Sequence, residues 1–280
     1  MRTAILIFIA LATTANCGKL KFKVATAEKP APEKQDKGGE DANFSNEHCI
    51  AVADGVGGWN EQGIDPSRYS RRLMKELSSA LYMDTQKYTE DPKQLAVIAA
   101  SRNKEIGTST LVIVTLDNKQ GVLRSANIGD SGYMILRKNA AGKFDLVYRS
   151  QEQQHSFNFP FQIGTNGDKP SNAEMNTHQV LKGDLVIVGS DGLFDNMYNE
   201  DIIKVVNDNI NKASKTLQST ADDILRETYR LSLDRSYISP FAKHAEEHNL
   251  YFRGGKSDDI TIVVGEIIFE EDPTEDSQSL

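Results

Sequence analysis

Four short segments each place an acidic residue beside glycine or another small residue, next to an apolar run. They cover Gly38–Ala42, Ala53–Gly58, Gly189–Asp195 and Lys256–Thr261. A buried carboxylate is costly unless it is paired or bound to a cation. Carboxylates that converge at strand ends suit hard divalent cations, which prefer oxygen ligands. Asp-Gly alone is a common turn dipeptide, but the joint occurrence of the four segments indicates a divalent-metal site.

Such a site has a defined hydrolytic chemistry. Two metal ions about 3.5–4 Å apart hold a bridging water and lower its pKa. They make hydroxide available near neutral pH and neutralise phosphate oxygens, so no Ser, Cys or His nucleophile is required. A small residue such as Gly55 lets the backbone come close enough for its carbonyl to join the metal shell.

Short β-branched segments and amphipathic segments predict the elements that position these acids. The predicted strands are Ile50–Ala53, Thr110–Leu116, Val122–Ala126, Tyr133–Arg137, Leu185–Val188 and Ile260–Ile268. The predicted helices are Pro66–Leu81, Gln94–Arg102, Glu200–Asn211 and Ser219–Leu233. Strands joined directly, with helices collected in pairs, favour an α+β fold of antiparallel sheets faced by helices over alternating βαβ units.

Composition limits the function classes. The 280 residues suit one large domain, and the net charge of −8, with no basic stripe, argues against a nucleic-acid partner. Cys17 and Cys49 form neither a disulfide framework nor a zinc site. We expect a monomer.

The chain ends are predicted to lie outside the domain. Residues 1–18 form an expected targeting segment, whose apolar run Ala4–Ala12 is too short for a confident membrane span. A secretory signal is favoured slightly over a mitochondrial presequence. The domain is expected over residues 20–269, entered through an exposed connection at Ala27–Lys37, with an acidic tail over residues 270–280.

The order of the motifs resembles that of the type 2C, metal-dependent protein phosphatases. The resemblance runs from Gly38 to about Val264, on Gly39–Ala42, Asp54–Trp59, Gly107–Thr110, Asn127–Gly132, Ser190–Asp195 and Asp258–Thr261. Further segments resemble the branch that includes mitochondrial matrix phosphatases: Gln153–His155, Phe157–Asn158, Ser239–Ala242 and Gly254–Lys256.

The resemblance implies a four-layer α-β-β-α sandwich with metal ions at one edge. It implies a protein serine/threonine phosphatase whose hydroxide is held by two Mg²⁺ or Mn²⁺ ions, with a possible weaker third ion. The substrate would be a phosphorylated protein.

Site residues follow from the same resemblance. Asp54 would bridge the two metals, Gly55 would lend its carbonyl, and Asp191 and Asp258 would complete one metal shell. Asp54, Asp191 and Asp258 are thus the expected catalytic set.

The remaining acids would serve the other ions. Glu40 would serve the second metal through water, with Asp41 supporting it. Asp130 matches the position of the weaker third metal, and the resemblance lets Asp195 share that ion.

The sequence departs from the family pattern at two places. Val56 stands where many members have a histidine that is proposed to protonate the leaving group, so we assign that role to metal-bound water. The phosphate-binding arginine before Glu-Asp is missing, and Lys34, or alternatively Lys37, is expected to replace it. Lysine supplies a point charge without the bidentate fork of arginine.

Two other functions compete. An aspartyl-phosphate hydrolase would need a nucleophilic carboxylate two residues before Asp191, where Gly189 stands. A phosphatase fold that has lost activity and serves as a binding protein would usually lack a metal ligand, whereas acids occupy Glu40, Asp54, Asp191 and Asp258.

Overall fold

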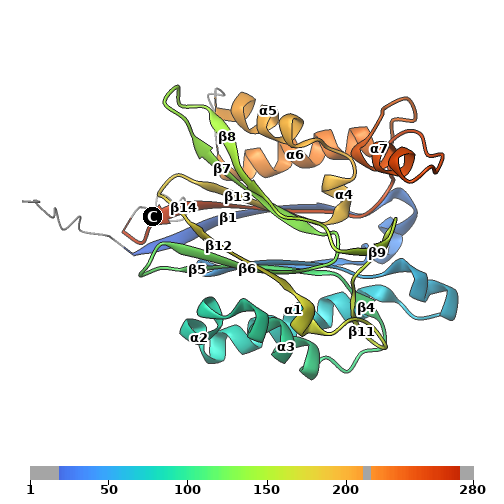
Figure 1. Cartoon of the computed structure of the whole chain (residues 1–280), viewed down its shortest axis with the longest axis horizontal. Coiled ribbons are helices and arrows are strands. Elements are labelled where there is room, and N and C mark those ends of the chain that lie inside the picture. Colours follow the sequence, from blue (N-terminus) through green and yellow to red (C-terminus); the bar gives the residue numbers. More distant parts are fainter. Residues whose placement is uncertain (1–18, 211–215, 272–280) are drawn as a thin grey trace, which may run out of the picture.

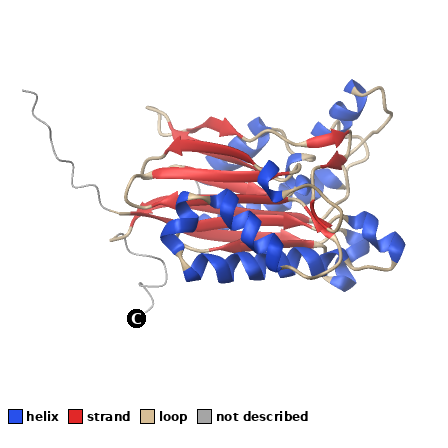
Figure 2. Cartoon of the chain, turned by 60° about the horizontal axis from the view of Figure 1, so that its bottom comes forward, coloured by secondary structure: helices blue, strands red, loops and turns tan. Residues whose placement is uncertain are grey.

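Two five-stranded antiparallel sheets pack face to face, and helices cover both outer faces (Figures 1 and 2). The computed structural model describes residues 19–210 and 216–271. This architecture confirms the predicted four-layer sandwich.

Each sheet combines strands from distant parts of the chain. Sheet A has the order β1 (Leu20–Lys29), β14 (Ile260–Phe269), β13 (Leu185–Gly189), β7 (Gly132–Lys138) and β8 (Phe144–Arg149). Sheet B has the order β12 (Glu174–Gln179), β6 (Val122–Ile128), β5 (Leu111–Asp117), β3 (Cys49–Asp54) and β2 (Asp41–Ser45). Short strands lie outside the two sheets: β4 (Thr108–Ser109), β9 (Gln154–Ser156), β10 (Phe159–Pro160) and β11 (Ile163–Gly164).

Three apolar layers hold the sandwich together. In β3, Ile50 and Val52 face the other sheet, whereas Ala51 and Ala53 pack towards the helices of sheet B. A strand that is buried on both faces carries a continuous apolar run rather than an alternating one. This explains why the central strands were recognisable as short β-branched runs.

The helices form two groups. α1 (Pro66–Met83), α2 (Thr85–Glu90) and α3 (Pro92–Arg102) cover sheet B, and α5 (Asn199–Ile210) and α6 (Leu217–Ser232) cover sheet A. Two shorter helices, α4 (Asp191–Phe194) and α7 (Pro240–Glu247), lie near the site edge. Three 3-10 helices complete the list: η1 (Pro32–Lys37), η2 (Gly57–Gln62) and η3 (Pro170–Asn172).

α1 shows why the helix predictions succeed. Asp65 caps the helix by accepting a hydrogen bond from the Ser67 backbone N–H at 3.0 Å, and Pro66 occupies the first turn. Leu73, Leu77 and Leu81 recur every four residues and are fully buried against sheet B.

The entry to the domain differs from the prediction. Ala27–Lys37 was expected to be an exposed connection, but β1 continues to Lys29 and η1 begins at Pro32. Ala27 is buried because β1 pairs with β14 along its whole length, and Ala31, which is also buried, donates its N–H to Asp259 Oδ1 at 2.8 Å. The expected targeting segment, residues 1–18, lies outside the described residues, as does the acidic tail beyond Glu271. Within the described ranges, none of the helices has the length and apolar run needed to cross a bilayer.

The acids gather because four strands begin or end at one edge of the sandwich. Asp41 begins β2 and lies opposite Asp54, the last residue of β3. Asp191 follows β13, and Asp258 precedes β14, which is the neighbour of β13. Antiparallel pairing brings a strand end next to the start of its neighbour, so these acids meet at one edge.

Candidate metal centre

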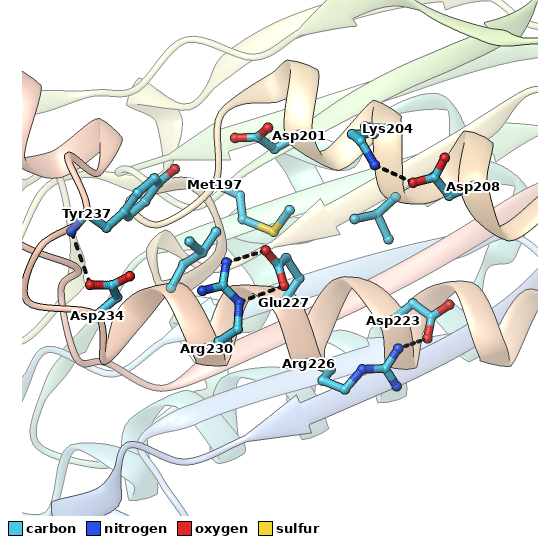
Figure 3. A pocket seen from close by; sticks show the side chains of 12 residues that line it. Met197, Asp201, Lys204, Asp208, Asp223, Arg226, Glu227, Arg230, Asp234 and Tyr237 are labelled. Carbon is cyan, nitrogen blue, oxygen red and sulfur yellow. Dashed lines mark hydrogen bonds and ion pairs between the residues drawn. The ribbon is translucent and has the colours of Figure 1, made fainter.

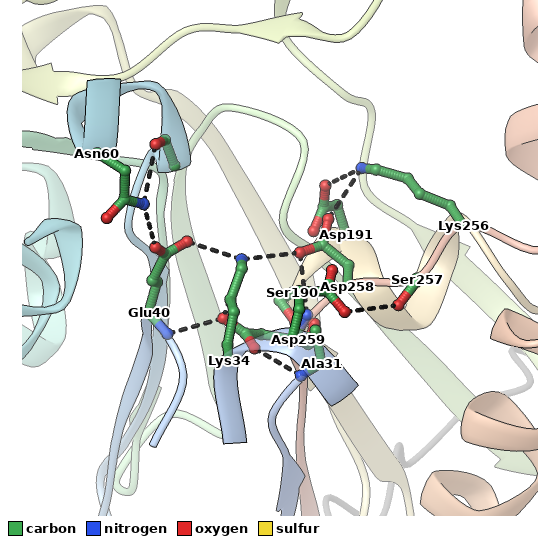
Figure 4. A network of polar contacts seen from close by, with 12 residues as sticks. Ala31, Lys34, Glu40, Asn60, Ser190, Asp191, Lys256, Ser257, Asp258 and Asp259 are labelled. Atoms are coloured by element: carbon green, nitrogen blue, oxygen red, sulfur yellow. Dashed lines mark hydrogen bonds and ion pairs between the residues drawn. The ribbon is translucent and has the colours of Figure 1, made fainter. Parts of the chain in front are cut away.

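Carboxylates from both sheets face one another at this edge (Figure 4). The network contains the predicted residues Glu40, Asp191 and Asp258, together with Asp259 and two lysines. Lys34 Nζ lies 2.7 Å from Glu40 Oε2 and 3.4 Å from Asp258 Oδ1. Lys37, the alternative phosphate contact, is exposed on η1.

Asp54 is positioned by hydroxyl groups. Its backbone N–H donates to Thr110 Oγ1 at 3.2 Å, and the Thr110 N–H donates to the Asp54 carbonyl at 2.9 Å. Thr110 Oγ1 also lies 2.8 Å from Ser131 Oγ, next to Asp130. The predicted bridging ligand and the predicted third-ion ligand thus share one hydrogen-bonded support.

Gly55 lies where a side chain does not fit. A Cβ there would come within 2.8 Å of the Pro66 carbonyl oxygen and 2.9 Å of the Glu40 carbonyl oxygen. This close approach brings the Gly55 backbone against the residue before β2, and only glycine leaves room for it.

Asp191 and Asp195 lie at the two ends of α4. Ser190, before the helix, ties the end of β13 to β14: its N–H donates to the Thr261 carbonyl, and its Oγ accepts from the Thr261 N–H, both at 3.1 Å. The two carboxylates approach the same group, because Lys256 Nζ lies 2.5 Å from Asp191 Oδ2 and 2.6 Å from Asp195 Oδ2.

Burial and neighbouring charges shift the pKa values of these acids. Burial, followed by the charge of Asp259, raises the pKa of Asp41 to about 8. Burial raises the pKa of Asp195 to about 7, although the charge of Lys256 opposes the shift.

The pKa values of three further acids are also raised. Burial, then Asp41, raises the pKa of Asp54, and burial, then Asp191, raises the pKa of both Asp130 and Asp258. Burial alone would raise the pKa of Asp191, but contact with Lys256 lowers it below its ordinary value. Cations favour the ionised form of every such group.

The residues fit divalent cations. In the described part of the chain, no three acid, His or Cys side chains are already arranged around one point as a metal shell. Asp130 Oδ1, Asp191 Oδ1 and both carboxylate oxygens of Asp41 are nevertheless buried without a hydrogen-bond donor. Buried oxygens of this kind need a cation or a donor, and a hard divalent ion accepts oxygen ligands only.

Three residues of the network were not predicted. Asn60 donates to Glu40 Oε1 at 2.6 Å, and Asp259 accepts from the backbone N–H groups of Ala31 at 2.8 Å and Glu40 at 2.7 Å. Asp259 therefore ties the start of η1 to the start of β2, and its Oδ2 also lies 3.3 Å from Lys34 Nζ. Lys256 is the third. Only Asp259, in the Asp-Asp pair, and Lys256, in Gly-Gly-Lys, belong to motifs that the sequence displays.

A larger pocket of about 680 Å³ lies away from these acids, between α5 and α6 (Figure 3). Three ion pairs lie within the groove: Lys204 with Asp208, Arg226 with Asp223, and Arg230 with Glu227. We assign no chemistry to it. A smaller pocket of about 260 Å³ borders the candidate metal centre, where Asp41 and Asp259 form part of its wall.

Comparisons with known proteins identify the family of the chain. The family model described as Stage II sporulation protein E (SpoIIE) matches residues 49–267. A relative from Arabidopsis thaliana, "Probable protein phosphatase 2C 55", is 41% identical over 88% of this chain, which spans only 51% of that relative. A second Arabidopsis relative, "Probable protein phosphatase 2C 80", is 38% identical over 90% of this chain, which spans 60% of that relative.

Other matches extend along most of both chains. The human protein phosphatase PTC7 homolog is 36% identical, with coverage of 81% of this chain and 78% of the relative. The solved structure of the photosystem II phosphatase PBCP matches with a TM-score of 0.79 and 30% identity, covering 88% of this chain and 98% of that chain. A match to the phosphatase PstP, which holds two manganese ions, has 15% identity and a TM-score of 0.60, and so supports the fold alone. On its motifs, its architecture and these similarities, the chain belongs to the type 2C protein phosphatase family.

Proposed function

We propose that the protein is a metal-dependent serine/threonine protein phosphatase. The observation that carries the proposal is the group of buried carboxylates at one sandwich edge, in which oxygens of Asp41, Asp130 and Asp191 lack donors. Both Arabidopsis relatives extend well beyond this chain, so the activity rests on this site and on the family together.

Mg²⁺ or Mn²⁺ would be held by the acids that the sequence predicts. Asp54, the Gly55 carbonyl, Asp191 and Asp258 would hold the main pair of ions, with Glu40 and Asp41 beside them and Asp130 and Asp195 at a weaker third position. When bound, such ions supply Lewis-acid chemistry, by lowering the pKa of water and by neutralising phosphate oxygens.

Lys34 is the proposed phosphate contact. Its side chain is about a quarter exposed, at 24%, and its ammonium group lies among acids that would themselves face the metal ions. Burial alone would lower the pKa of Lys34, but Asp258 and Glu40 raise it above its ordinary value, so the group stays positive. It can therefore move from Glu40 to a phosphate oxygen without a change of charge.

Activity is favoured over an inactive binding role. Acids occupy four proposed metal positions, Glu40, Asp54, Asp191 and Asp258, and lost ligands are the usual mark of an inactive member. The substrate would be a phosphorylated protein, because the named relatives are protein phosphatases.

The compartment rests on the N-terminal segment. Similarity to PTC7 homologues supports the branch resemblance found in the sequence, and so favours the mitochondrial alternative over secretion. A fluorescent fusion of the full chain, compared with one lacking residues 1–18, tests this. Co-localisation of only the full chain with mitochondria supports the proposal, and secretion overturns it.

Turnover of a phosphothreonine peptide tests the function. The chain from Leu20 onward is assayed with Mn²⁺, with Mg²⁺ and with EDTA. Release of phosphate with either metal and none with EDTA is expected. A folded protein that binds Mn²⁺ but shows no turnover would contradict the proposal and favour the binding-protein alternative.

A further inference from the structure

Lys256 places its ammonium group among three of the acids (Figure 4). Its Nζ atom lies 2.5 Å from Asp191 Oδ2, 2.6 Å from Asp195 Oδ2 and 3.3 Å from Asp258 Oδ2. Two of these acids belong to the main metal pair, and Asp195 belongs to the weaker third position. The lysine thus lies where the two groups of ligands meet.

The backbone of Lys256 is held in place by Asn196, which lies just after α4. Its N–H donates to Asn196 Oδ1, and its carbonyl accepts from Asn196 Nδ2, both at 2.8 Å. Asn196 is fully buried and also donates to the Gly192 carbonyl at 2.9 Å. This amide therefore fixes the start of the lysine side chain relative to α4, which carries Asp191.

The preceding glycine is required for this placement. A Cβ on Gly255 would come within 2.0 Å of the Leu231 carbonyl oxygen, so only glycine lets the loop pass the end of α6. The Lys256 Nζ atom lies 5.0 Å from the centre of the Phe241 ring, and the side chain is 15% exposed. Lys256 is held at its backbone and enclosed along its side chain.

Lys34, the other lysine of the network, differs from Lys256 in the element that carries it and in how far its side chain is enclosed. It is mounted on η1, is more exposed, and contacts Glu40, Asp258 and Asp259 rather than Asp191 or Asp195. Lys256 is therefore the fixed cation on the side of the site where the third ion would lie.

We propose that Lys256 is a built-in cation that takes the place of a divalent ion between Asp191 and Asp195 and so limits how many metal ions the site holds. The inference rests on the proposed metal centre. A fixed ammonium group in contact with these carboxylates repels a divalent ion there and uses two of the oxygens that the ion would need.

Binding of Mn²⁺ alone tests this role. Lys256→Met keeps most of the length of the side chain but removes its charge. Mn²⁺ is titrated by calorimetry, and bound metal is counted after equilibrium dialysis. We expect Lys256→Met to bind one more Mn²⁺ than the wild type, or to bind its weakest ion at least tenfold more tightly.

Two control variants separate charge from structure. Lys256→Arg keeps a positive charge and is expected to retain the wild-type Mn²⁺ count. Lys243→Gln removes one charge from the exposed face of α7 and is expected to change neither count nor affinity. An unchanged or reduced Mn²⁺ count in Lys256→Met, with the wild-type affinities or weaker ones, would overturn the proposal.

Loss of folding is tested separately. Metal-free Lys256→Met is expected to unfold at a lower temperature than the wild type, and saturating Mn²⁺ is expected to remove most of that difference. If the metal-free variant cannot be isolated, competition with a fluorescent chelator on Mn²⁺-purified protein still gives the count.

The outcome is independent of the proposed activity. A wild type without turnover whose Lys256→Met variant gains an ion would overturn the phosphatase proposal and keep this inference. If the wild type shows metal-dependent turnover and Lys256→Met binds the same number of Mn²⁺ ions as the wild type, the phosphatase proposal is kept and this inference is overturned.

Discussion

Asp41 and Asp54 lie directly opposite each other in the antiparallel register of β2 and β3. Like charges opposite each other destabilise a sheet, and here both groups are also buried. The arrangement therefore costs stability unless protons or cations compensate it. The same pairing brings two predicted metal ligands to one edge. The loss of stability and the proposed metal site therefore both arise from the register of β2 and β3.

The first prediction concerns the metal-free protein. The folded-state pKa of Asp41 is raised to about 8 from an ordinary value of 3.8, so the folded state holds a proton that the unfolded state has lost. Stability therefore falls as pH rises between about 4 and 8. Asp41→Asn removes this loss and is expected to be more stable than the wild type in EDTA at pH 8, by about 1–3 kcal/mol.

Thermal unfolding at several pH values checks this prediction. The advantage of Asp41→Asn should shrink towards pH 4.5 and reverse with saturating Mn²⁺. Asp36→Asn, on the exposed face of η1, is the matched control. A metal-free Asp41→Asn protein no more stable than the wild type at pH 8 would show that the acids are not in electrostatic conflict.

A second prediction separates the two candidate phosphate contacts. Lys34→Gln removes the ammonium group that lies near Glu40, and Lys37→Gln removes one on the exposed side of the same 3-10 helix. A charged hydrogen bond contributes roughly 1.5–3 kcal/mol, so Lys34→Gln is expected to lower kcat/KM by about 10–100-fold. Lys37→Gln should leave kcat/KM unchanged. Equal effects of the two substitutions would remove Lys34 from the phosphate site.

A third prediction follows from Val56. Its backbone N–H donates to the Thr108 carbonyl at 3.0 Å, and its side chain is half-buried directly after Gly55. Without a side-chain acid there, alkyl phosphates should be hydrolysed more slowly than aryl phosphates, whose leaving groups need no proton. Val56→His should narrow this gap by at least about tenfold, since general acids contribute roughly 10²–10⁴-fold.

Steady-state kinetics on a phosphothreonine peptide and p-nitrophenyl phosphate check this third prediction. Val56→Leu is the control for a change of side chain without an acid. If the rates on both substrates change in parallel in Val56→His, the position does not govern protonation of the leaving group.

A fourth prediction concerns Asn60, which donates to Glu40 Oε1 at 2.6 Å. Partners that orient a metal ligand typically contribute 10–100-fold to metal affinity. Asn60→Ala is expected to weaken Mn²⁺ binding by about tenfold, whereas Gln62→Ala, exposed on the same 3-10 helix, should not. Titration calorimetry with Mn²⁺ distinguishes the two, and equal affinities would show that Asn60 does not orient Glu40.

The sequence predicted those elements whose own residues form a helical or a strand pattern. Pro66, the spacing of Leu73 to Leu81 and the β-branched runs located α1 and the central strands before the structure was known. β1 was missed even though Leu20 and Phe22 alternate with Lys21 and Lys23. Its continuation through Ala27–Lys29 reads as a charged connection, and only pairing with β14, more than 230 residues away, makes it a strand.

The site likewise contains residues that a local pattern predicted and contacts that no local pattern predicted. The acids were visible because they stand close to glycine or another small residue, next to an apolar strand. The contact between Lys256 and Asp191 joins residues 65 positions apart, and the link between Asp259 and Ala31 joins residues 228 apart. Neither leaves a local pattern, because the partners meet only after β1, β13 and β14 have paired.

The central claim is that Asp54 holds the proposed metal ions for phosphate hydrolysis. Phosphate release from a phosphothreonine peptide at saturating Mn²⁺ should be measured for the wild type, Asp54→Asn and Asp36→Asn. Metal catalysis supplies several kcal/mol, so kcat of Asp54→Asn should fall by roughly 10³-fold while the protein stays folded. Asp36→Asn should keep the wild-type rate. An Asp54→Asn protein that turns over within about tenfold of the wild type would contradict this account of the site.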